Sequence, residues 1–140
     1  GELDGLWETF YSEKDNNPFV LHGPIRTREN YKDGKPDGLW ELFRQNGQLG
    51  SKGNVKDGKQ DGPWEWFYEN GQLEEKQNYK NGKEDGLWEW FYKNGQLKSK
   101  RNYQNGKEYS VWRTLLVVNG PLETRINYKN GELVGFVETI

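Results

Sequence analysis

The sequence contains no cysteine and no methionine, and its only histidine is His22. Without cysteine the chain can form neither a disulfide framework nor a thiolate metal site. Apolar residues make up only 31% of the chain, and no run of them approaches the ~20 residues of a membrane-spanning helix. The formal net charge of −2 provides no overall attraction for nucleic acid or anionic lipid. We therefore expect no nucleic-acid partner, and the sequence does not favour membrane binding by this segment.

Aromatic residues, by contrast, are abundant. They reach 15% of the chain, with seven Trp and eight Tyr, a content that a disordered chain would lack. A length of 140 residues fits one domain, but the low apolar content would not fill a thick two-layer core. The composition therefore predicts a folded, thin structure. The chain starts at Gly1 rather than Met, so we expect a trimmed N-terminus and leave the cellular compartment open.

A repeat of 24 residues organises the chain. The segment DGPWEWFYENGQLEEKQNYKNGKE (residues 61–84) is followed by DGLWEWFYKNGQLKSKRNYQNGKE (residues 85–108), and only six aligned positions differ. These units begin at Asp61 and Asp85, and less regular units begin near Asp4, Asp37, Tyr109 and Val134. The first of these carries an insertion at residues 12–22. Self-similarity at a fixed period indicates a repeat architecture, so residues 1–140 are predicted to form a single array.

Each unit is predicted to fold as one β-hairpin. The run WEWFY is rich in strand-forming residues, and NG follows it closely. A second NG or DG lies eleven residues later, as Asn81-Gly82 does after Asn70-Gly71. Both are expected to form two-residue type I′ turns, in which both positions need positive φ. Without sustained helical periodicity, the sequence predicts an all-β fold, an elongated single-layer antiparallel β-meander of tandem hairpins of about 24 residues.

The turns also predict the strand register. A two-residue loop at Asn70-Gly71 places Glu65 opposite Lys76 and Tyr68 opposite Leu73. The same rule pairs opposite charges in two neighbouring hairpins, Glu41 with Lys52 and Glu89 with Lys100, as cross-strand pairing favours. At the second turns it pairs an asparagine with an aspartate: Asn30 with Asp37, Asn54 with Asp61, and Asn78 with Asp85.

Side chains that alternate along the strands divide into two faces. The first, here called the Trp face, is predicted to carry a structural spine made of Trp7, Trp40, Trp64, Trp66, Trp88, Trp90 and Trp112. It also holds Leu73, Tyr79 and three glycines whose missing side chains leave room for a ring, Gly38, Gly62 and Gly86. The second, here called the charge face, carries the Glu–Lys pairs together with Phe43, Phe67 and Phe91. Burial of ~200 Å² of a Trp contributes up to about 5 kcal/mol, against roughly 0.2–1 kcal/mol for an exposed ion pair, so the spine is expected to stabilise the sheet.

The repeat resembles MORN-type repeats (membrane occupation and recognition nexus), through a tryptophan and its following turns in five units: Trp7, Trp40, Trp64, Trp88 and Trp112. The pattern DGxWxxFYxNGQL is similar to the bacterial variant found in proteins labelled YwqK-family antitoxins. The resemblance covers essentially the whole chain. It breaks at residues 12–22, at Tyr109-Ser110 in place of Asp-Gly, and at Val137 in place of Trp. It implies an elongated hairpin array that acts as a scaffold or binding surface, and the antitoxin label implies a toxin as partner.

Groups that could carry catalysis are sparse. His22 lies beside a turn glycine, and no serine lies in a nucleophile-elbow setting. Glutamates recur with the repeat, each opposite a lysine, whereas a catalytic pair would normally occur once. Oxygen donors in the insertion could hold Ca²⁺, but a solvated loop is the simpler interpretation of Glu13, Asp15, Asn16 and Asn17. The sequence predicts no enzyme, no metal site and no cofactor.

Two binding functions stay open. In the first, the array is a scaffold for protein–protein interaction, with candidate contact residues on the charge face and in the insertion: Phe43, Phe67, Phe91, Asp15, Phe19 and His22. In the second, it binds carbohydrate or cell wall, because other aromatic hairpin repeats stack sugars on exposed rings. The exposure of the Trp rings distinguishes the two functions, since packed rings offer no stacking platform. We favour protein interaction because WEWFY places its rings on both faces.

The segment VWRTLLVVNGP (residues 111–121) departs most from the repeat. Arg113 replaces the usual glutamate, so the Glu–Lys pair is expected to be lost. Leu115 and Val117 are predicted to continue the line of Phe residues, while Leu116 and Val118 lie on the opposite face. A strand that is apolar on both faces needs cover that a thin sheet cannot supply. We therefore expect Leu115 and Val117 to contact a partner protein, a second copy of the array, or a part of the natural chain outside these residues.

Overall fold

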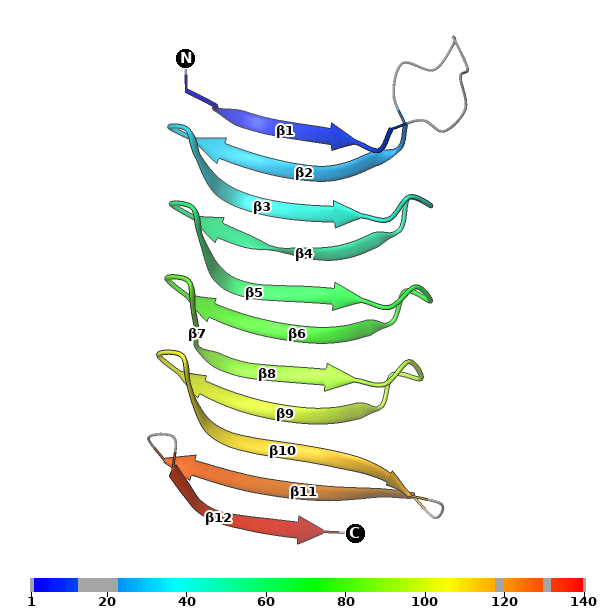
Figure 1. Ribbon diagram of the computed structural model, residues 1–140, viewed down its shortest axis with the longest axis vertical. Helices are drawn as coiled ribbons and strands as arrows, with labels where there is room; N and C mark the ends of the chain where they lie inside the picture. Colours follow the sequence, from blue (N-terminus) through cyan, green and yellow to red (C-terminus); the bar gives the residue numbers. More distant parts are fainter. Residues whose placement is uncertain (1, 13–22, 118–119, 130–131, 140) are drawn as a thin grey trace.

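A computed structural model describes residues 2–12, 23–117, 120–129 and 132–139, with side-chain positions in residues 2–12 and 23–108. The chain forms one antiparallel sheet of twelve strands (Figure 1). The first six strands are β1 (Gly5–Phe10), β2 (Ile25–Lys32), β3 (Lys35–Phe43), β4 (Leu49–Lys56), β5 (Lys59–Phe67) and β6 (Leu73–Lys80). The other six are β7 (Lys83–Glu84), β8 (Gly86–Phe91), β9 (Leu97–Gln104), β10 (Lys107–Val117), β11 (Gly120–Lys129) and β12 (Glu132–Thr139).

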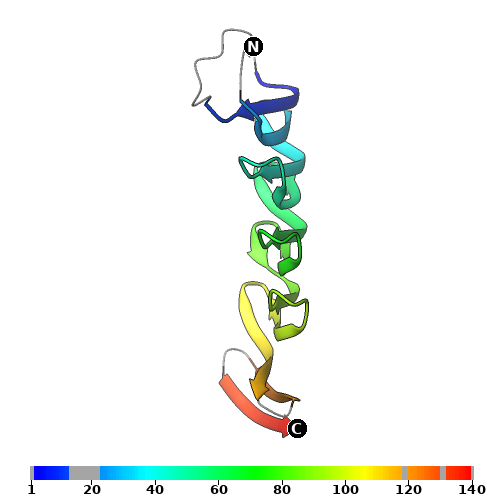
Figure 2. The same cartoon turned by 90° about the vertical axis from the view of Figure 1, so that its right-hand side faces the viewer.

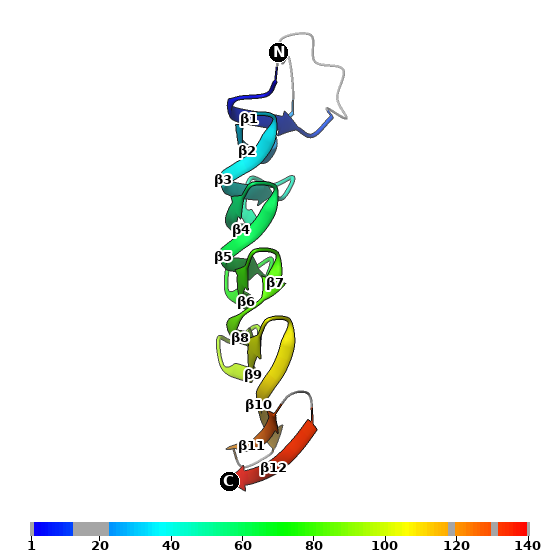
Figure 3. The ribbon, with the colours of Figure 1, turned by 90° about the vertical axis from the view of Figure 1, so that its left-hand side faces the viewer.

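The strands follow one another across the sheet in chain order, and the short β7 pairs with β6 beside the main path. Figures 2 and 3 show the sheet edge-on as a narrow column of curled strands, and the described residues place no second layer on either face. The predicted single-layer, all-β meander of tandem hairpins is confirmed. Within the described ranges, no helix has the length and apolar character needed to cross a membrane.

The two turns of each unit differ in geometry. At the second turn both central residues have positive φ, as at Asn81 (50°) and Gly82 (80°), so the predicted type I′ turn is confirmed there. At the first turn only the glycine is left-handed, as at Gly71 (85°). The amide of Gly71 donates to the carbonyl of Tyr68 at 3.0 Å, and the amide of Tyr68 donates to the carbonyl of Gln72 at 2.8 Å. The first turn is therefore a longer loop, a type I turn followed by a left-handed glycine, and the predicted type I′ geometry is wrong there.

The longer first turn changes the pairing next to it. Phe67, rather than the predicted Tyr68, lies opposite Leu73, and Glu74 is the extra residue of a bulge. The same shift recurs in the hairpins β3–β4 and β8–β9. Without the bulge, a loop longer by one residue would move every side chain of β6 to the other face. Leu73 therefore pairs with the charge face, and its predicted place on the Trp face is wrong.

The predicted charge pairs are confirmed away from the bulges: Glu41 lies opposite Lys52, Glu65 opposite Lys76, and Glu89 opposite Lys100. The pairing also continues between hairpins, with Lys52 opposite Glu65 and Lys76 opposite Glu89. A single column of alternating charge therefore runs across β3 to β9. Because like charges in this column would repel, it specifies the register between units as well as within them.

A second irregularity follows each second turn, at the Asp-Gly that opens a unit. The amide of Asp85 donates to the carbonyl of Asn78 at 3.0 Å, so these residues pair as predicted. The next residue, Gly86, has a φ of 99°. At the equivalent Gly62 (φ 86°), a Cβ would meet no atom within 4 Å. These glycines are required by the left-handed backbone, and the prediction that they leave room for a ring is wrong.

β10 pairs with β9 in an offset register. Trp112 lies opposite Lys100, the position that Glu89 takes opposite Lys76 in the preceding unit. Arg113, which replaces the usual glutamate of the repeat, lies opposite Ser99 instead. The bulge before this position shifts the pairing by one residue, whereas the bulge between β4 and β5 shifts it by two. An offset of one residue reverses the alternation of a strand relative to its neighbours.

Candidate functional site

The Trp face is closely packed for a sheet of one layer. Trp64 is 4% exposed and Trp88 is 8% exposed. The indole Nε1 of Trp64 donates to the carbonyl of Asn54 at 3.0 Å, and that of Trp88 donates to the carbonyl of Asn78 at 2.9 Å. Each acceptor lies on the last strand of the preceding hairpin. The two indoles therefore connect consecutive units, in addition to the backbone ladder.

Rings of neighbouring units also lie against one another. The ring centroids of Trp40 and Trp64 are 5.4 Å apart. Trp88 contacts three other rings, at 5.2 Å for Tyr79, 5.1 Å for Tyr103 and 5.9 Å for Trp90. Tyr79 thus lies on the Trp face as predicted. Aromatic pairs at such distances contribute about 0.5–1.5 kcal/mol in addition to the energy of burying their surface. These rings therefore stabilise the array by packing against one another.

Gly53 makes the packing of Trp64 possible, and sequence reasoning missed it. Gly53 lies directly opposite Trp64, and a Cβ on it would lie within 2.1 Å of the indole. The ring therefore lies flat on the backbone of β4. The signal in the sequence is that the position equivalent to Gly53 holds Gln77 and Arg101 in the next two units.

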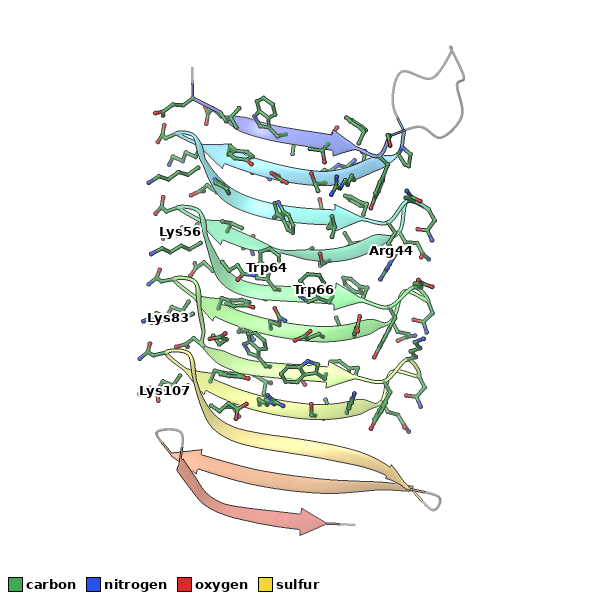
Figure 4. All side chains as sticks on the ribbon, viewed as in Figure 1. Arg44, Lys56, Trp64, Trp66, Lys83 and Lys107 are labelled. Atoms are coloured by element: carbon green, nitrogen blue, oxygen red, sulfur yellow. The ribbon has the colours of Figure 1, made fainter. Side chains whose placement is uncertain are left out.

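Trp66 and Trp90 lie on the same face, two residues along from Trp64 and Trp88, and both are half-buried. Figure 4 shows Trp66 near the middle of β5, beside Trp64. Glu75 lies opposite Trp66 on one side and opposite Trp90 on the other. A carboxylate therefore lies between two indoles in the register, where cross-strand side chains are in contact range.

The electrostatics of this region centre on Tyr79. Burial raises the pKa of its hydroxyl, and the carboxylates of Glu84 and Glu75 raise that pKa further. The hydroxyl donates to Oε1 of Gln77 at 3.0 Å, and Nε2 of Gln77 donates to Oε1 of Glu75 at 2.7 Å. Two carboxylates from the same unit thus act on one tyrosine, which stays protonated and serves as a donor.

The charge face presents a row of half-buried phenylalanines beside the Glu–Lys column. In the register each phenylalanine lies opposite a leucine: Phe43 opposite Leu49, Phe67 opposite Leu73, and Phe91 opposite Leu97. The guanidinium of Arg28 lies 5.4 Å from the ring centroid of Phe43. The row combines apolar and charged groups, a composition that suits a protein contact.

The MORN repeat variant family matches the chain twice, at residues 60–81 and at residues 84–105. The chain therefore carries MORN-type repeats. Each match spans one hairpin and its second turn, which agrees with the repeat unit described above. No curated protein matches the chain.

MORN repeats generally serve as non-enzymatic binding modules, so the family suggests a repeat module for binding. In the MORN hairpins that the structure describes, no group of three or more His, Cys, Asp or Glu residues could hold a metal ion. The functional surface is therefore sought on the two faces of the sheet and at its edges.

The MORN array is more open at β1 than in its middle. Trp7 is 46% exposed and Leu6 is 60% exposed, because the described residues place no strand beyond β1 in the sheet. The Trp7 ring still lies 6.5 Å from that of Tyr31. At the other end of the array, the side chain of Trp112 lies outside the described residues.

Several predicted contact residues fall where the structure gives no side chain. Asp15, Phe19 and His22 lie outside the described residues. The backbone of Leu115 and Val117 belongs to β10, opposite Leu122 and Gly120, but their side chains are likewise outside. The backbone pairing of β10 with β9 is offset by one residue, and the predicted place of Leu115 and Val117 in line with the Phe residues stays a prediction. Their predicted role in a partner contact stays a prediction.

The two edges of the MORN array carry contacts between turns. At the first-turn edge, the Tyr68 hydroxyl donates to the carbonyl of Phe91 at 2.7 Å, and Nη2 of Arg44 donates to the carbonyl of Phe67 at 2.6 Å. At the second-turn edge, the amide of Gly82 donates to the carbonyl of Gln60 at 2.8 Å. Figure 4 shows Arg44 at the first edge and three exposed lysines at the second, Lys56, Lys83 and Lys107. These hydrogen bonds join turns one unit apart.

Proposed function

We propose that this MORN-type array is a non-enzymatic scaffold that binds a partner protein. The burial of the central indoles is the observation that carries the proposal. Sugar stacking needs an exposed ring, whereas Trp64 and Trp88 are 4% and 8% exposed and lie against other rings. The faces instead offer half-buried aromatic rings, a residue type that is enriched in protein interfaces.

The regularity of the array supports a scaffold. Repeat units that contact only their neighbours extend a surface without a new core. Here the charge column and the indole hydrogen bonds recur from unit to unit. The residues that vary between units, together with the insertion at residues 12–22, supply specificity. An antitoxin-like role is the special case in which the partner is a toxin.

Cross-linked capture tests the proposal. The protein is immobilised, exposed to an extract of its source organism, cross-linked and analysed by mass spectrometry. A panel of glycans and cell-wall fragments is assayed in parallel. We expect one protein to be captured reproducibly, with cross-links on the lysines that flank one face. Binding of a glycan with no protein captured would instead establish the carbohydrate function. A variant with Trp64→Ala, which removes the central packing, serves as the unfolded control.

A further inference from the structure

Two consecutive units with nearly identical sequences differ in charge on the Trp face. Gln77 lies opposite Trp64, and Arg101 lies opposite Trp88, so the two residues occupy equivalent positions. The unit at residues 85–108 thus has a cation where the unit at residues 61–84 has a neutral amide. The side chains around each position show whether the nearby carboxylates have a cation to pair with.

The cation in the second unit stacks on a ring and pairs with a carboxylate, although its Nε is buried without a hydrogen-bond partner. The guanidinium carbon of Arg101 lies 5.1 Å from the ring centroid of Trp90, and Nη1 forms an ion pair with Oε1 of Glu108 at 2.8 Å. The hydroxyl of Tyr103 also reaches Oε1 of Glu108, at 3.4 Å. A guanidinium stacked on an indole and paired with a carboxylate is a favourable arrangement.

The first unit holds the same aromatic and acidic groups around a neutral side chain. Gln77 is 8% exposed, and its Nε2 donates to Oε1 of Glu75 at 2.7 Å. Trp66 is equivalent to Trp90, and Glu84 is equivalent to Glu108. Glu75 adds a second carboxylate, where the next unit has Ser99. Among the side chains that the structure describes, neither Glu75 nor Glu84 takes part in an ion pair. The region is aromatic, carries two negative charges and has no cation of its own.

Polar atoms beside Trp66 are also unsatisfied. Ser51 lies opposite Trp66 in the register and is 0% exposed, and its hydroxyl has no hydrogen-bond partner. The indole Nε1 of Trp66 has none either, whereas those of Trp64 and Trp88 are bonded. A buried polar group without a partner costs roughly 1–3 kcal/mol. Of these two groups, only the Ser51 hydroxyl can accept a hydrogen bond from a guanidinium, which carries donors alone.

We propose that Trp66, Glu75 and Glu84 form a binding site for an arginine side chain of a partner protein, which stacks on the half-buried Trp66 ring as Arg101 stacks on Trp90 in the next unit. The proposal rests on the proposed function and names the chemistry of one contact. Arginine fits better than lysine because its planar group can stack on the indole and donate several hydrogen bonds to the carboxylates at once. Arg101 is the chain's own example of this arrangement.

Titration of the whole chain, followed by the indole N–H resonances in nitrogen-15 NMR, tests the site directly. The probe is N-acetyl-arginine amide, and the control is N-acetyl-citrulline amide, which has nearly the same shape and no charge. We expect a saturable shift of the Trp66 indole resonance with the arginine probe alone. Equal shifts with both probes, or no shift at Trp66, would overturn the proposal. Tetramethylammonium is titrated in parallel, and tighter binding of that ion would assign the site to quaternary ammonium groups instead.

Matched variants locate the charge that matters. Glu75→Gln should weaken binding of the arginine probe at least fivefold, while Glu74→Gln, at the exposed bulge position next to it, should change it less than twofold. Equal losses of affinity in the Glu75 and Glu74 variants would indicate a diffuse electrostatic attraction and would overturn the proposed site. Gln77→Arg should abolish the Trp66 response, because it supplies the cation internally as in the next unit. Arg101→Gln should do the reverse and make the Trp90 indole respond to the probe.

The capture experiment separates this proposal from the proposed function. If the wild type captures a partner and Gln77→Arg captures at least fivefold less, both stand. If both chains capture the partner equally, the arginine site is wrong and the scaffold function stands. If the wild type captures no protein, the scaffold function fails, whatever the small probe does at Trp66. Urea unfolding of each variant checks that the variant is folded. If Gln77→Arg does not fold, the response of the Trp90 indole in Arg101→Gln still tests the site.

Discussion

At the scale of single residues, the indole of Trp64 and the bare backbone of Gly53 form one packing unit. Trp64 lies flat on β4 because Gly53 has no side chain, and a Cβ there would lie 2.1 to 2.4 Å from three atoms of the indole. Such distances cannot be relieved by a small rotation, since the ring is 4% exposed and its Nε1 is bonded to the backbone of Asn54. The two residues are therefore fixed together.

Gly53→Ala should destabilise the array by roughly 1–3 kcal/mol, the usual range for overpacking. Gly50→Ala is the matched control on the same strand, because a Cβ there would come no closer than 3.4 Å to any atom and should cost less than about 1 kcal/mol. Urea unfolding followed by circular dichroism measures both. Equal losses at the two positions would show that Gly53 does not hold the Trp64 ring.

The stability of the array is expected to come from the Trp face. Trp64→Ala and Trp88→Ala should each lower the free energy of unfolding by roughly 3–5 kcal/mol, as large-to-small changes at buried positions do. Lys76→Ala, in the charge column, should lower it by less than about 1 kcal/mol, because exposed ion pairs contribute little. The same urea experiment compares the three. A loss for the Lys76 variant that matches those of the Trp variants would contradict this division between the faces.

At the scale of elements, the same dipeptide forms two different turns. Asn81-Gly82 is a type I′ turn, whereas in Asn70-Gly71 only the glycine has positive φ. NG suits both geometries, so the dipeptide alone cannot decide between them. Side-chain contacts favour the longer loop, because Oδ1 of Asn70 accepts from the amide of Gln72 at 3.0 Å and its Nδ2 donates to the carbonyl of Lys93 at 3.0 Å. The second contact belongs to the next unit, which a turn rule does not consider.

The sequence predicted the features that follow from alternation along a strand, and it missed those that depend on contacts between units. Alternation by two residues correctly placed Glu65 opposite Lys76 and Tyr79 on the Trp face. The β-bulges, by contrast, could not be predicted from alternation. Each bulge compensates for the length of a loop, so its position depends on the whole hairpin. The candidate arginine site was missed because Gln77 and Arg101 look like an ordinary surface substitution until the register places an indole and a carboxylate beside each.

The insertion at residues 12–22 is an element whose removal should leave the sheet intact. Its flanks are already paired, since the amide of Tyr11 donates to the carbonyl of Pro24 at 2.9 Å, and long surface loops cost little stability. We predict that replacement of Ser12–His22 by a short turn leaves the urea midpoint nearly unchanged and weakens binding of a captured partner. Unchanged affinity for that partner would reject the functional role of Asp15, Phe19 and His22.

At the scale of the whole molecule, each hairpin contacts only its neighbours. Indole hydrogen bonds, stacked turns and the charge column all join strands that follow one another in the chain. In such an array the stability is approximately a sum of unit and interface terms. A change in one unit is therefore expected to act on that unit and the two beside it, which is why one unit can keep an open arginine site while the next has filled its own.

Because each hairpin contacts only its neighbours, we expect the strand at residues 111–117 to need cover from outside the sheet. Apolar residues occupy both odd and even positions of this strand, so the sequence predicts apolar groups on both of its sides. A single-layer sheet covers neither side. Leu115 and Val117 lie two residues apart in β10 and so share one side of the strand. We predict that Leu115→Glu combined with Val117→Lys weakens association with a second copy or a partner and leaves the array folded. Light scattering over a range of concentrations measures the change. A mass that is the same for wild type and variant at every concentration would show that β10 has no such contact, and that local curling of the sheet covers the apolar residues instead.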